Sequence, residues 1–461
     1  MKKRSFDSSN ATAISFMVVL LLSIFSVLYI YYGASFPRFN HLSSFSNSPS
    51  LPKKYQDQSD QKEKPITKWD PILQDESQIS CDLSHYHYDL CSINSPTVLD
   101  PITSTFYVIG PKSPRNFIHK IRPYPRKWEN LTMLKVKEIT LISGPRSPKC
   151  DIIHNTTALV FSAGGYTGNF FHDFNDGFLP LFITIRSMSL SNQDVVLVIE
   201  KSRDWWVSKY SDLLGAFSNY PILNLDNENI THCFTSATLG LISHGFMTIK
   251  PKLMPKPTTL LDFHFFLNKA YSKAQQSNSL REVDRPKLVL FSRSGGVGRV
   301  ILNEVEIKNM AENIGFNVII FEPNHRTSMS EAHGLINDSH VAVGVHGAAL
   351  THFLFLRPGS IFIQVIPIGV DEVAEMCFGG PAKEMGLTYL EYKIRIEESS
   401  LIKKYNKLDP ILVDPLASNK NWWALLGRVY LKEQNVELDL IRFRKYLNYA
   451  YKKAKRSMYK G

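Results

Sequence analysis

The chain has 461 residues, of which 44% are hydrophobic and 12% aromatic, and its formal net charge at pH 7 is +11. This length and composition exclude a small single-core module and predict a globular protein of two or more domains. The positive charge is uneven, which excludes a wholly basic surface: eight basic residues and no acid lie near the C-terminus, at Arg442, Arg444, Lys445, Lys452, Lys453, Lys455, Arg456 and Lys460.

The N-terminus has the pattern of a membrane anchor. Residues 8–36 carry no charge, and residues 14–32 are almost wholly apolar, long enough at roughly 1.5 Å per residue to cross a bilayer. A Lys-Lys-Arg cluster at residues 2–4 keeps the N-terminus cytosolic. A cleaved signal peptide is the rival interpretation, but bulky Tyr32 spoils the small-x-small cleavage pattern. We predict a cytosolic tail at 1–12, a transmembrane signal anchor at 13–33 and a lumenal body.

The segment after the anchor, residues 34–80, is rich in Ser, Gln, Lys, Asp and Pro, and we predict a flexible stem. In an oxidising lumen Cys81 and Cys91 are close enough for a loop-closing disulfide. Cys150 with Cys233 is a second candidate bridge, which leaves Cys377 free. Four sequons are candidate glycosylation sites, at Asn130, Asn155, Asn229 and Asn337.

The next region, residues 81–280, alternates strand and helix patterns. We expect strands at 157–162 and 195–200 and helices at 169–188 and 204–214, which indicates a first α/β domain. Three prolines, Pro251, Pro255 and Pro257, break the pattern near its end.

One helix of this domain carries a candidate general base. His172 and Asp176 are four residues apart and share a helical face, with Asn169 on the same side as an orienting residue. A carboxylate beside a histidine fixes its orientation, as a general base requires. An exposed His–Asp pair without a role is the plainer interpretation of this spacing, and Asp173 is an alternative base.

The second domain, residues 281–461, has a clearer strand-helix order. We expect strands at 287–292, 317–321, 341–345 and 360–367, helices at 303–313, 349–356 and 436–457, and a capping box from Ser328 to Glu331. This order predicts a parallel, Rossmann-like sheet, which binds ligands at the carboxyl ends of its strands. The basic helix at the end is interpreted as a solvated face, with attraction to acidic polysaccharide or membrane as the alternative.

Two turns of this sheet could hold a diphosphate. Arg293 and Arg299 flank a Gly-rich loop after one strand, and His346-Gly347-Ala348 follows another strand and opens a helix. The loop lacks Gly-Lys-Ser/Thr, which excludes a Walker A ATPase. No Asp-x-Asp motif follows the anchor, so we expect no metal and no other cofactor, with the arginines neutralising the phosphates.

At these residues the sequence resembles plant glycosyltransferase family 61, type II Golgi membrane enzymes that decorate xylan. The resemblance covers most of the chain after Cys81 and rests on separated motifs: CDLSHYHYDLC, AGGYTGNFFHDFNDGFLPLF, LVLFSR with GRVILNE, VGVHGAALTHFLFLRPGS, QVIPIG and GGPAKEMGLTYLEY. It implies a GT-B fold, with two Rossmann-like domains facing a cleft, and an inverting mechanism. It further implies a donor site at Arg293, Arg299, Asn303, Glu304, His346, Gly347, Ala348 and Gln364. Gln364 stands where some members have a glutamate.

The resemblance implies transfer of a pentose from a UDP-sugar onto the xylan backbone of the cell wall in the Golgi. UDP-xylose (β-1,2 transfer) and UDP-arabinofuranose (α-1,3 transfer) both stay open. So do transfer to protein-linked glycans and a non-catalytic role in a xylan synthase complex, although intact site residues disfavour the last. A complex with other xylan-synthesising enzymes is compatible with the sequence. Nucleic acid is not expected as a partner, because the basic tail would lie in a lumen.

Overall fold

The computed structural model describes residues 79–108, 117–144, 147–188, 194–272, 285–294, 296–416 and 422–458. The predicted cytosolic tail, signal anchor and nearly all of the stem lie outside these residues. In the described ranges, no helix is both long enough and apolar enough to cross a membrane.

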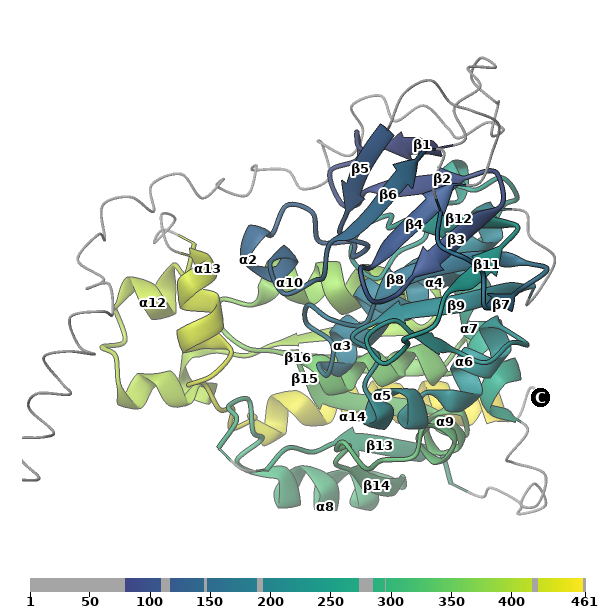
Figure 1. The fold of residues 1–461 in the computed structure, drawn as a ribbon. Helices are drawn as coiled ribbons and strands as arrows, with labels where there is room; N and C mark the ends of the chain where they lie inside the picture. Colours follow the sequence, from purple (N-terminus) through teal and green to yellow (C-terminus); the bar gives the residue numbers. More distant parts are fainter. Residues whose placement is uncertain are drawn as a thin grey trace, which may run out of the picture. The chain divides into compact units, whose positions relative to one another are not determined.

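The second half of the described chain, residues 285–458, contains one five-stranded sheet whose paired strands all run parallel (Figure 1). Strands rich in Val, Ile and Leu suit a sheet that is buried on both faces. The predicted parallel sheet is confirmed, and it contains a fifth strand that the sequence did not predict. In spatial order the strands are β14 (Asn317–Phe321), β13 (Lys287–Phe291), β15 (Val341–Val345), β16 (Ile361–Ile366) and β17 (Thr388–Lys393).

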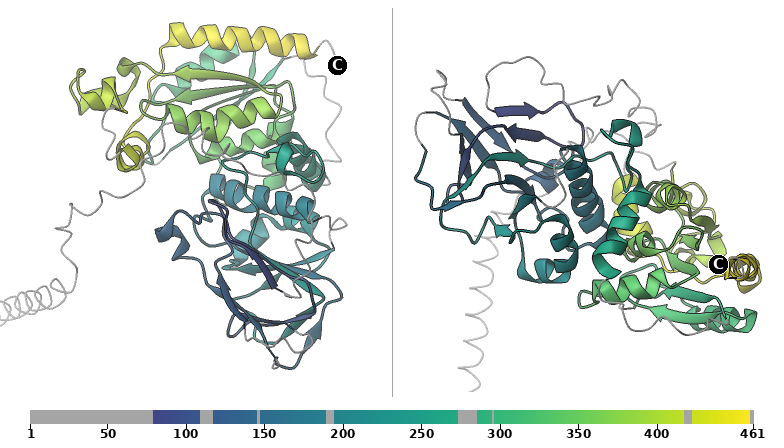
Figure 2. Two further views of the ribbon diagram at one scale, coloured as in Figure 1. Left: turned by 90° about the horizontal axis from the view of Figure 1, so that it is seen from above. Right: turned by 90° about the vertical axis from the view of Figure 1, so that its right-hand side faces the viewer.

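Both faces of this sheet are covered. Alternate residues of the strands pack with α8 (Glu304–Ile314) and α14 (Leu440–Met458) on one side. The others join a larger core with α9 (Met329–Asn337) and the 3₁₀ helix η4 (Ala348–Phe355). Figure 2 shows α14, in yellow, lying along the sheet. The sequence predicted an α-helix where η4 lies; the Leu350 N–H instead bonds to the Gly347 carbonyl, which is the tighter 3₁₀ pattern.

The first half, residues 79–272, contains two sheets (Figure 1). The first has a parallel part with an antiparallel edge, in the order β1 (Ile79–Asp82), β2 (Leu90–Ile93), β12 (Ser236–Leu239), β8 (Thr157–Ser162), β9 (Val195–Glu200) and β10 (Leu223–Asn224). The second has the order β5 (Phe117–Ile121), β6 (Ile139–Ser143), β4 (Thr105–Val108), β3 (Thr97–Asp100), β11 (His232–Phe234) and β7 (Ile152–Ile153).

The α/β class is confirmed, and the two strands predicted for the first half are β8 and β9. The second sheet was not predicted. Its strands are two to five residues long and include charged or polar positions, such as the His and Lys of β5, so they lack a clear apolar run.

The helix predicted at 169–188 is confirmed, although its middle turn is π-helical. It consists of α3 (Phe170–His172), the π-helix η1 (Asp173–Phe178) and α4 (Leu179–Ser187). Its hydrophobic residues share one core with α9 and η4 of the second half. Further helices of the first half are α2 (Asn130–Met133), α5 (Asp204–Lys209), α6 (Ser211–Phe217), η2 (Pro251–Leu253) and α7 (Leu260–Tyr271).

The remaining helices of the second half follow η4. They are α10 (Asp371–Ala374), η5 (Glu375–Gly379), α11 (Gly380–Glu384), η6 (Ile396–Glu398), η7 (Ser400–Lys403), α12 (Pro410–Val413), α13 (Trp422–Leu425) and η9 (Leu426–Tyr430). The predicted C-terminal helix begins at Leu440 rather than 436, because Val436 forms β-bridges with Ile301 and Ser399.

Candidate active site

The first candidate cluster lies where α3 passes into η1. His172 Nδ1 lies 2.8 Å from Asp176 Oδ2, so the two side chains that the spacing placed on one face do meet. Tyr124 donates its hydroxyl to the same carboxylate oxygen at 2.9 Å, and Arg126 donates Nε to Oδ1 at 3.0 Å. The Asp176 side chain is 2% exposed and that of His172 is 19% exposed, so the pair is embedded while the ring reaches the surface.

The contacts of Asp176 fix its charge. Burial alone raises the pKa of this carboxyl, but the Arg126 charge and the hydrogen bond from His172 outweigh burial and lower the pKa to about 2. An ionised carboxylate accepts hydrogen bonds only, so the bond to Asp176 requires the proton of a neutral His172 on Nδ1; in that tautomer the Arg126 Nη at 3.1 Å makes no hydrogen bond to the ring. The lone pair of the ring then lies on Nε2, as a general base requires.

Arg126 is a member of this cluster that the sequence did not reveal. Its guanidinium bonds Asp176 and Glu129, and one Nη lies 3.1 Å from His172 Nδ1. Burial lowers the pKa of Arg126, but the charges of Asp176 and Glu129 raise it above its ordinary value. Arg126 precedes Asp176 by 50 residues, and the only available signal was that a buried carboxylate needs a cation.

The two neighbours of His172 in the predicted motif have other contacts. Asp173 is buried and accepts hydrogen bonds from Tyr210 Oη at 2.8 Å and from the Gly168 N–H at 3.0 Å. Burial raises the pKa of the Asp173 carboxyl. Asn169 caps the helix by accepting from the Phe171 N–H at 3.1 Å. The structure therefore brings Asp176, rather than Asp173, to the imidazole.

The second candidate cluster lies at the carboxyl ends of β13 and β15. Arg299 Nη1 donates to the His346 carbonyl at 3.1 Å. A Cβ at Gly347 would lie 2.5 Å from an Arg293 Nη and 2.8 Å from Arg299 Nη1, so only glycine leaves room for both guanidinium groups. The two predicted turns therefore come together, as their shared sheet edge required.

The loop that carries Arg299 is held in a strained conformation. Arg299 has φ +60°, in the left-handed region that few non-glycine residues adopt. Its N–H bonds to the Gln434 carbonyl at 2.5 Å, and the Val300 N–H bonds to Asn435 Oδ1 at 3.1 Å. The segment after η9 thus fixes the direction in which Arg299 points.

Arg293 and Arg299 form a cationic pair without a counter-charge. No carboxylate among the described residues lies within ion-pair distance of either one, and Arg299 Nε is buried without a hydrogen-bond partner in that part of the chain. Burial and the neighbouring Arg293 charge lower the pKa of Arg299 to about 9. Two desolvated like charges are unfavourable alone, and an anion would stabilise both.

A relay of hydrogen bonds sets the state of His346. Tyr389 donates its hydroxyl to Gln364 Oε1 at 2.8 Å, so the Gln364 amide nitrogen points at His346 Nδ1, 3.0 Å away. Nδ1 must then accept, and Nε2 carries the proton. Burial and the charges of Arg299 and Arg293 lower the pKa of His346 to about 3, so the ring is neutral.

The remaining predicted donor-site residues differ in their contacts. Asn303 uses its amide on the backbone of Leu438 in both directions, at 2.8 and 3.0 Å, and so ties α8 to the segment before α14. Glu304 is the first residue of α8 and is partly exposed. Ala348 opens η4 and is also partly exposed.

Aromatic contacts connect the two clusters. The ring of Phe378, in η5, lies 5.3 Å from His346 and 5.6 Å from Phe171, the neighbour of His172. Phe170 stacks on His352 of η4 with ring centroids 4.1 Å apart. Phe378 therefore lies between Phe171, the neighbour of the base cluster (Tyr124, Arg126, His172 and Asp176), and His346 of the cationic cluster (Arg293, Arg299 and His346).

Known proteins resemble this chain over most of its length. Residues 168–363 match the family model described as Glycosyltransferase 61. An Arabidopsis thaliana xylan glycosyltransferase is 41% identical over 83% of this chain and 81% of its own length. Two rice proteins, a beta-1,2-xylosyltransferase and an alpha-1,3-arabinosyltransferase, are 32% and 35% identical over 80% and 79% of this chain and 83% and 62% of their own lengths.

The chain belongs to glycosyltransferase family 61. It is therefore a glycosyltransferase, and the family region of residues 168–363 contains both His172 and the two arginines. Arg126 and Tyr124 precede that region, and Tyr389 follows it. The family match thus covers the candidate base, Asp176 and the candidate donor arginines, while other hydrogen-bond partners in these clusters come from both flanks.

Both candidate disulfides are present in this family 61 chain, Cys81–Cys91 and Cys150–Cys233, and Cys377 is free and buried. Among the described residues, the one compact group of possible metal ligands is Cys81, Cys91 and His119, and its thiols are disulfide-bonded. Of the four sequon asparagines, three are exposed: Asn130, Asn155 and Asn229.

Asn337 is less accessible than the other sequon asparagines. Its amide nitrogen donates to Asn268 Oδ1 at 3.3 Å and to the Phe355 carbonyl at 3.2 Å. A glycan on this nitrogen replaces one of its two hydrogens, so it would break at least one of these two bonds.

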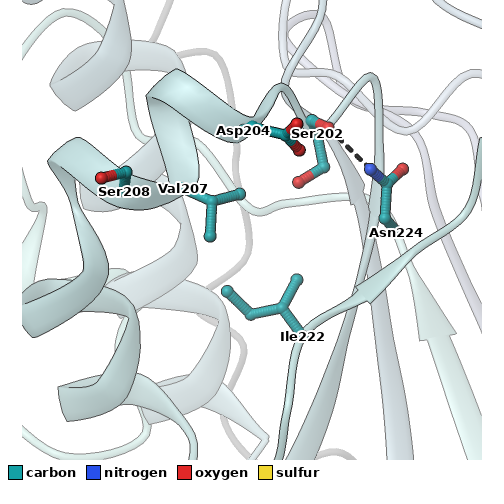
Figure 3. Close-up of a pocket in the computed structure, with 6 residues that line it drawn as sticks. All are labelled: Ser202, Asp204, Val207, Ser208, Ile222 and Asn224. Atoms are coloured by element: carbon teal, nitrogen blue, oxygen red, sulfur yellow. Dashed lines mark hydrogen bonds between the residues drawn. The ribbon is translucent and has the colours of Figure 1, made fainter. Parts of the chain in front are cut away.

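A cavity of about 330 Å³ lies beside α5, away from these clusters (Figure 3). Asn224 Nδ2 bonds across it to the Ser202 carbonyl at 2.8 Å. None of the candidate site residues lines it; its lining residues are Ser202, Asp204, Val207, Ser208, Ile222 and Asn224.

Proposed function

We propose that this protein is an inverting, metal-independent pentosyltransferase that moves xylose or arabinofuranose from a UDP-sugar to the xylan backbone. One observation supports the proposal: Phe378 contacts both His346, beside the uncompensated pair of arginines, and Phe171, the neighbour of the His–carboxylate pair. The names of the relatives, xylan glycosyltransferase, xylosyltransferase and arabinosyltransferase, support xylan and a pentose.

In the proposed reaction an acceptor hydroxyl attacks the anomeric carbon of the donor sugar. The bond from the acceptor oxygen to that carbon forms as the bond from the carbon to the UDP oxygen breaks. His172 Nε2 takes the acceptor proton, and Asp176 stabilises the resulting imidazolium through Nδ1–H. The electron pair of the broken bond leaves with UDP.

The leaving group needs charge stabilisation rather than a proton. Arg293 and Arg299 supply two positive charges next to the Gly347 backbone, and His346 Nε2–H supplies a neutral donor. These groups suit a diphosphate, because guanidinium and phosphate form charge-assisted hydrogen bonds. The proposal assigns neutralisation of the diphosphate to these residues instead of a metal.

The proposal includes the GT-B organisation and the location of the enzyme. Residues 81–280 would hold the acceptor and residues 281–461 the donor; the parallel strands in both halves support this assignment. The uncharged span at 13–33 and the basic residues before it support a single-pass Golgi protein with a lumenal catalytic domain. A C-terminal tag should be protected from protease in sealed vesicles; a cytosolic tag would contradict this topology.

The activity is tested with the full chain in detergent, UDP-xylose or UDP-arabinofuranose, and xylo-oligosaccharides. We expect one UDP-pentose to be transferred with inversion, with His172→Ala as the inactive control, and we expect activity to survive EDTA. Strict dependence on manganese, or transfer to protein-linked glycans alone, would contradict the proposal.

A further inference from the structure

The disulfide loop between β1 and β2 has no role in the chemistry described above. It presents an aromatic ring to solvent: the Tyr86 side chain is 57% exposed and stacks on Trp128, with centroids 5.4 Å apart and the ring planes at 11°. Two residues later, Tyr88 is buried in the main core and anchors the loop. The Tyr86 ring is therefore exposed on one side and held by a second aromatic ring on the other.

The loop is fixed in place at several points. The Cys81–Cys91 disulfide closes its base. The Lys127 N–H donates to the His87 carbonyl at 3.1 Å, and the Lys127 ammonium lies 2.7 Å from the Asp89 carboxylate. The Tyr86 ring is therefore preorganised, which reduces the entropy lost when a ligand binds to it.

Trp128 links this ring to the base cluster. The Arg126 guanidinium, which holds Asp176, lies 5.3 Å from the Trp128 ring and 5.6 Å from the Tyr166 ring. Tyr166 itself stacks on His172, with centroids 4.4 Å apart. Tyr166, the Arg126 guanidinium and Trp128 thus connect the candidate base to the exposed ring of Tyr86.

A polar group lies along the same line. Glu129 accepts from Arg126 Nη1 at 2.7 Å and from the Tyr166 hydroxyl at 2.8 Å, and its side chain remains 25% exposed. Each carboxylate oxygen can accept two hydrogen bonds, and Oε1 has only the Arg126 bond among the described residues. A sugar hydroxyl could therefore donate to Oε1.

We propose that the disulfide loop forms the distal acceptor subsite, with the Tyr86 ring stacking on a pyranose unit of a neutral β-linked polysaccharide. A xylopyranose with equatorial hydroxyls presents axial C–H bonds on its faces, and these match the negative face of an aromatic ring. Trp128 is a positioning residue in this assignment, since it acts through Tyr86. The assignment of xylan rests on the proposed function; the stacking of a pyranose chain does not.

The test compares Tyr86→Ala with Tyr449→Ala, in the full chain. Tyr449 is 50% exposed on α14 and serves as a matched control for the loss of an exposed tyrosine. We expect Tyr86→Ala to raise KM for xylohexaose about three- to tenfold, with little change for xylobiose, kcat or UDP binding. Tyr86→Phe should retain wild-type KM, because the ring rather than the hydroxyl binds.

Two further measurements keep the test decisive. The Cys81→Ser, Cys91→Ser double variant should raise KM for xylohexaose while UDP still binds, because the loop loses its closure. Tyr86→Ala should also weaken the binding of xylohexaose in the absence of donor. If it does so while no UDP-pentose is transferred by the wild type, the distal subsite is supported and the proposed function is wrong. If the wild type transfers a UDP-pentose and Tyr86→Ala leaves the xylohexaose KM unchanged, or lowers only kcat, the distal subsite is wrong and the proposed function is supported.

Discussion

The base cluster and the cationic cluster differ in how their buried charges are compensated. Around Asp176 every charged group has a partner. Arg126 bonds to the carboxylates of Asp176 and Glu129, and Asp176 also bonds to His172. Around Gly347 two guanidinium groups lie together without an acid in the described residues. A cluster whose charges are all compensated in the absence of ligand suits a group that must keep one geometry throughout the reaction. A cluster with uncompensated positive charge suits a site that binds an anion.

The largest expected effect is on the base. We expect His172→Ala to lower turnover about 10²–10⁴-fold, the usual cost of losing a positioned base, while UDP affinity stays normal. Asp176→Asn should cost less, because it disturbs orientation without removing the proton acceptor. Turnover and UDP binding are measured separately on each variant. If His172→Ala keeps full turnover and Asp173→Asn abolishes it, Asp173 is the base.

The same contrast predicts different stabilities for two arginine variants. Arg126→Met leaves the buried Asp176 carboxylate without its main counter-charge and should cost about 3–5 kcal/mol of unfolding free energy. Arg299→Met removes one of two like charges and should cost much less in the absence of ligand. Denaturant unfolding of both variants tests this, with the exposed pair Lys308–Glu312 as a control expected to contribute about 0–1 kcal/mol. Equal destabilisation by both arginine variants would remove the contrast.

Ligand binding should reverse this order. Arg293→Ala or Arg299→Ala should weaken UDP binding by about 1.5–3 kcal/mol, the range for hydrogen bonds to charged groups. Arg126→Met, where it remains folded, should leave the UDP affinity unchanged, because its partners are Asp176 and Glu129. Calorimetric titration with UDP, with and without EDTA, measures both effects. A loss of UDP binding on chelation would contradict neutralisation by arginine alone.

The sequence predicted these two clusters to different depths. A four-residue spacing was sufficient to pair His172 with Asp176, and strand order was sufficient to bring Arg299 to the turn after β15. The sequence alone could not place Arg126. Its contact with Asp176 spans 50 residues and depends on a second sheet, which is made of short strands without apolar periodicity. Local patterns report local geometry, whereas the counter-charge of a buried carboxylate is fixed only by the tertiary fold.

Gln364 illustrates the same limit beside the cationic cluster. The resemblance placed it among donor-binding residues, where a glutamate could hold ribose hydroxyls. In the structure its side chain is buried, and both ends of its amide are used, one by Tyr389 and one by His346. Its contribution to donor binding would then act through the imidazole of His346.

The smallest expected effect follows from that relay. In Gln364→Glu the carboxylate would accept hydrogen bonds from Tyr389 and from His346 Nδ1–H. The single N–H of the neutral imidazole would then be on Nδ1 instead of Nε2, and the phosphate site would lose one hydrogen-bond donor. The loss of one hydrogen bond should weaken UDP binding by about 0.5–1.5 kcal/mol at pH 8.

The new carboxylate also favours the imidazolium and so raises the pKa of His346 from about 3. As the pH falls toward 6, the charged ring regains its Nε2–H, and the UDP affinity of Gln364→Glu should recover, whereas that of the wild type should not change for this reason. Titration with UDP between pH 6 and 8, together with ¹⁵N shifts of the His346 ring, measures affinity and tautomer at once. An unchanged tautomer in Gln364→Glu would show that Gln364 does not set the state of His346.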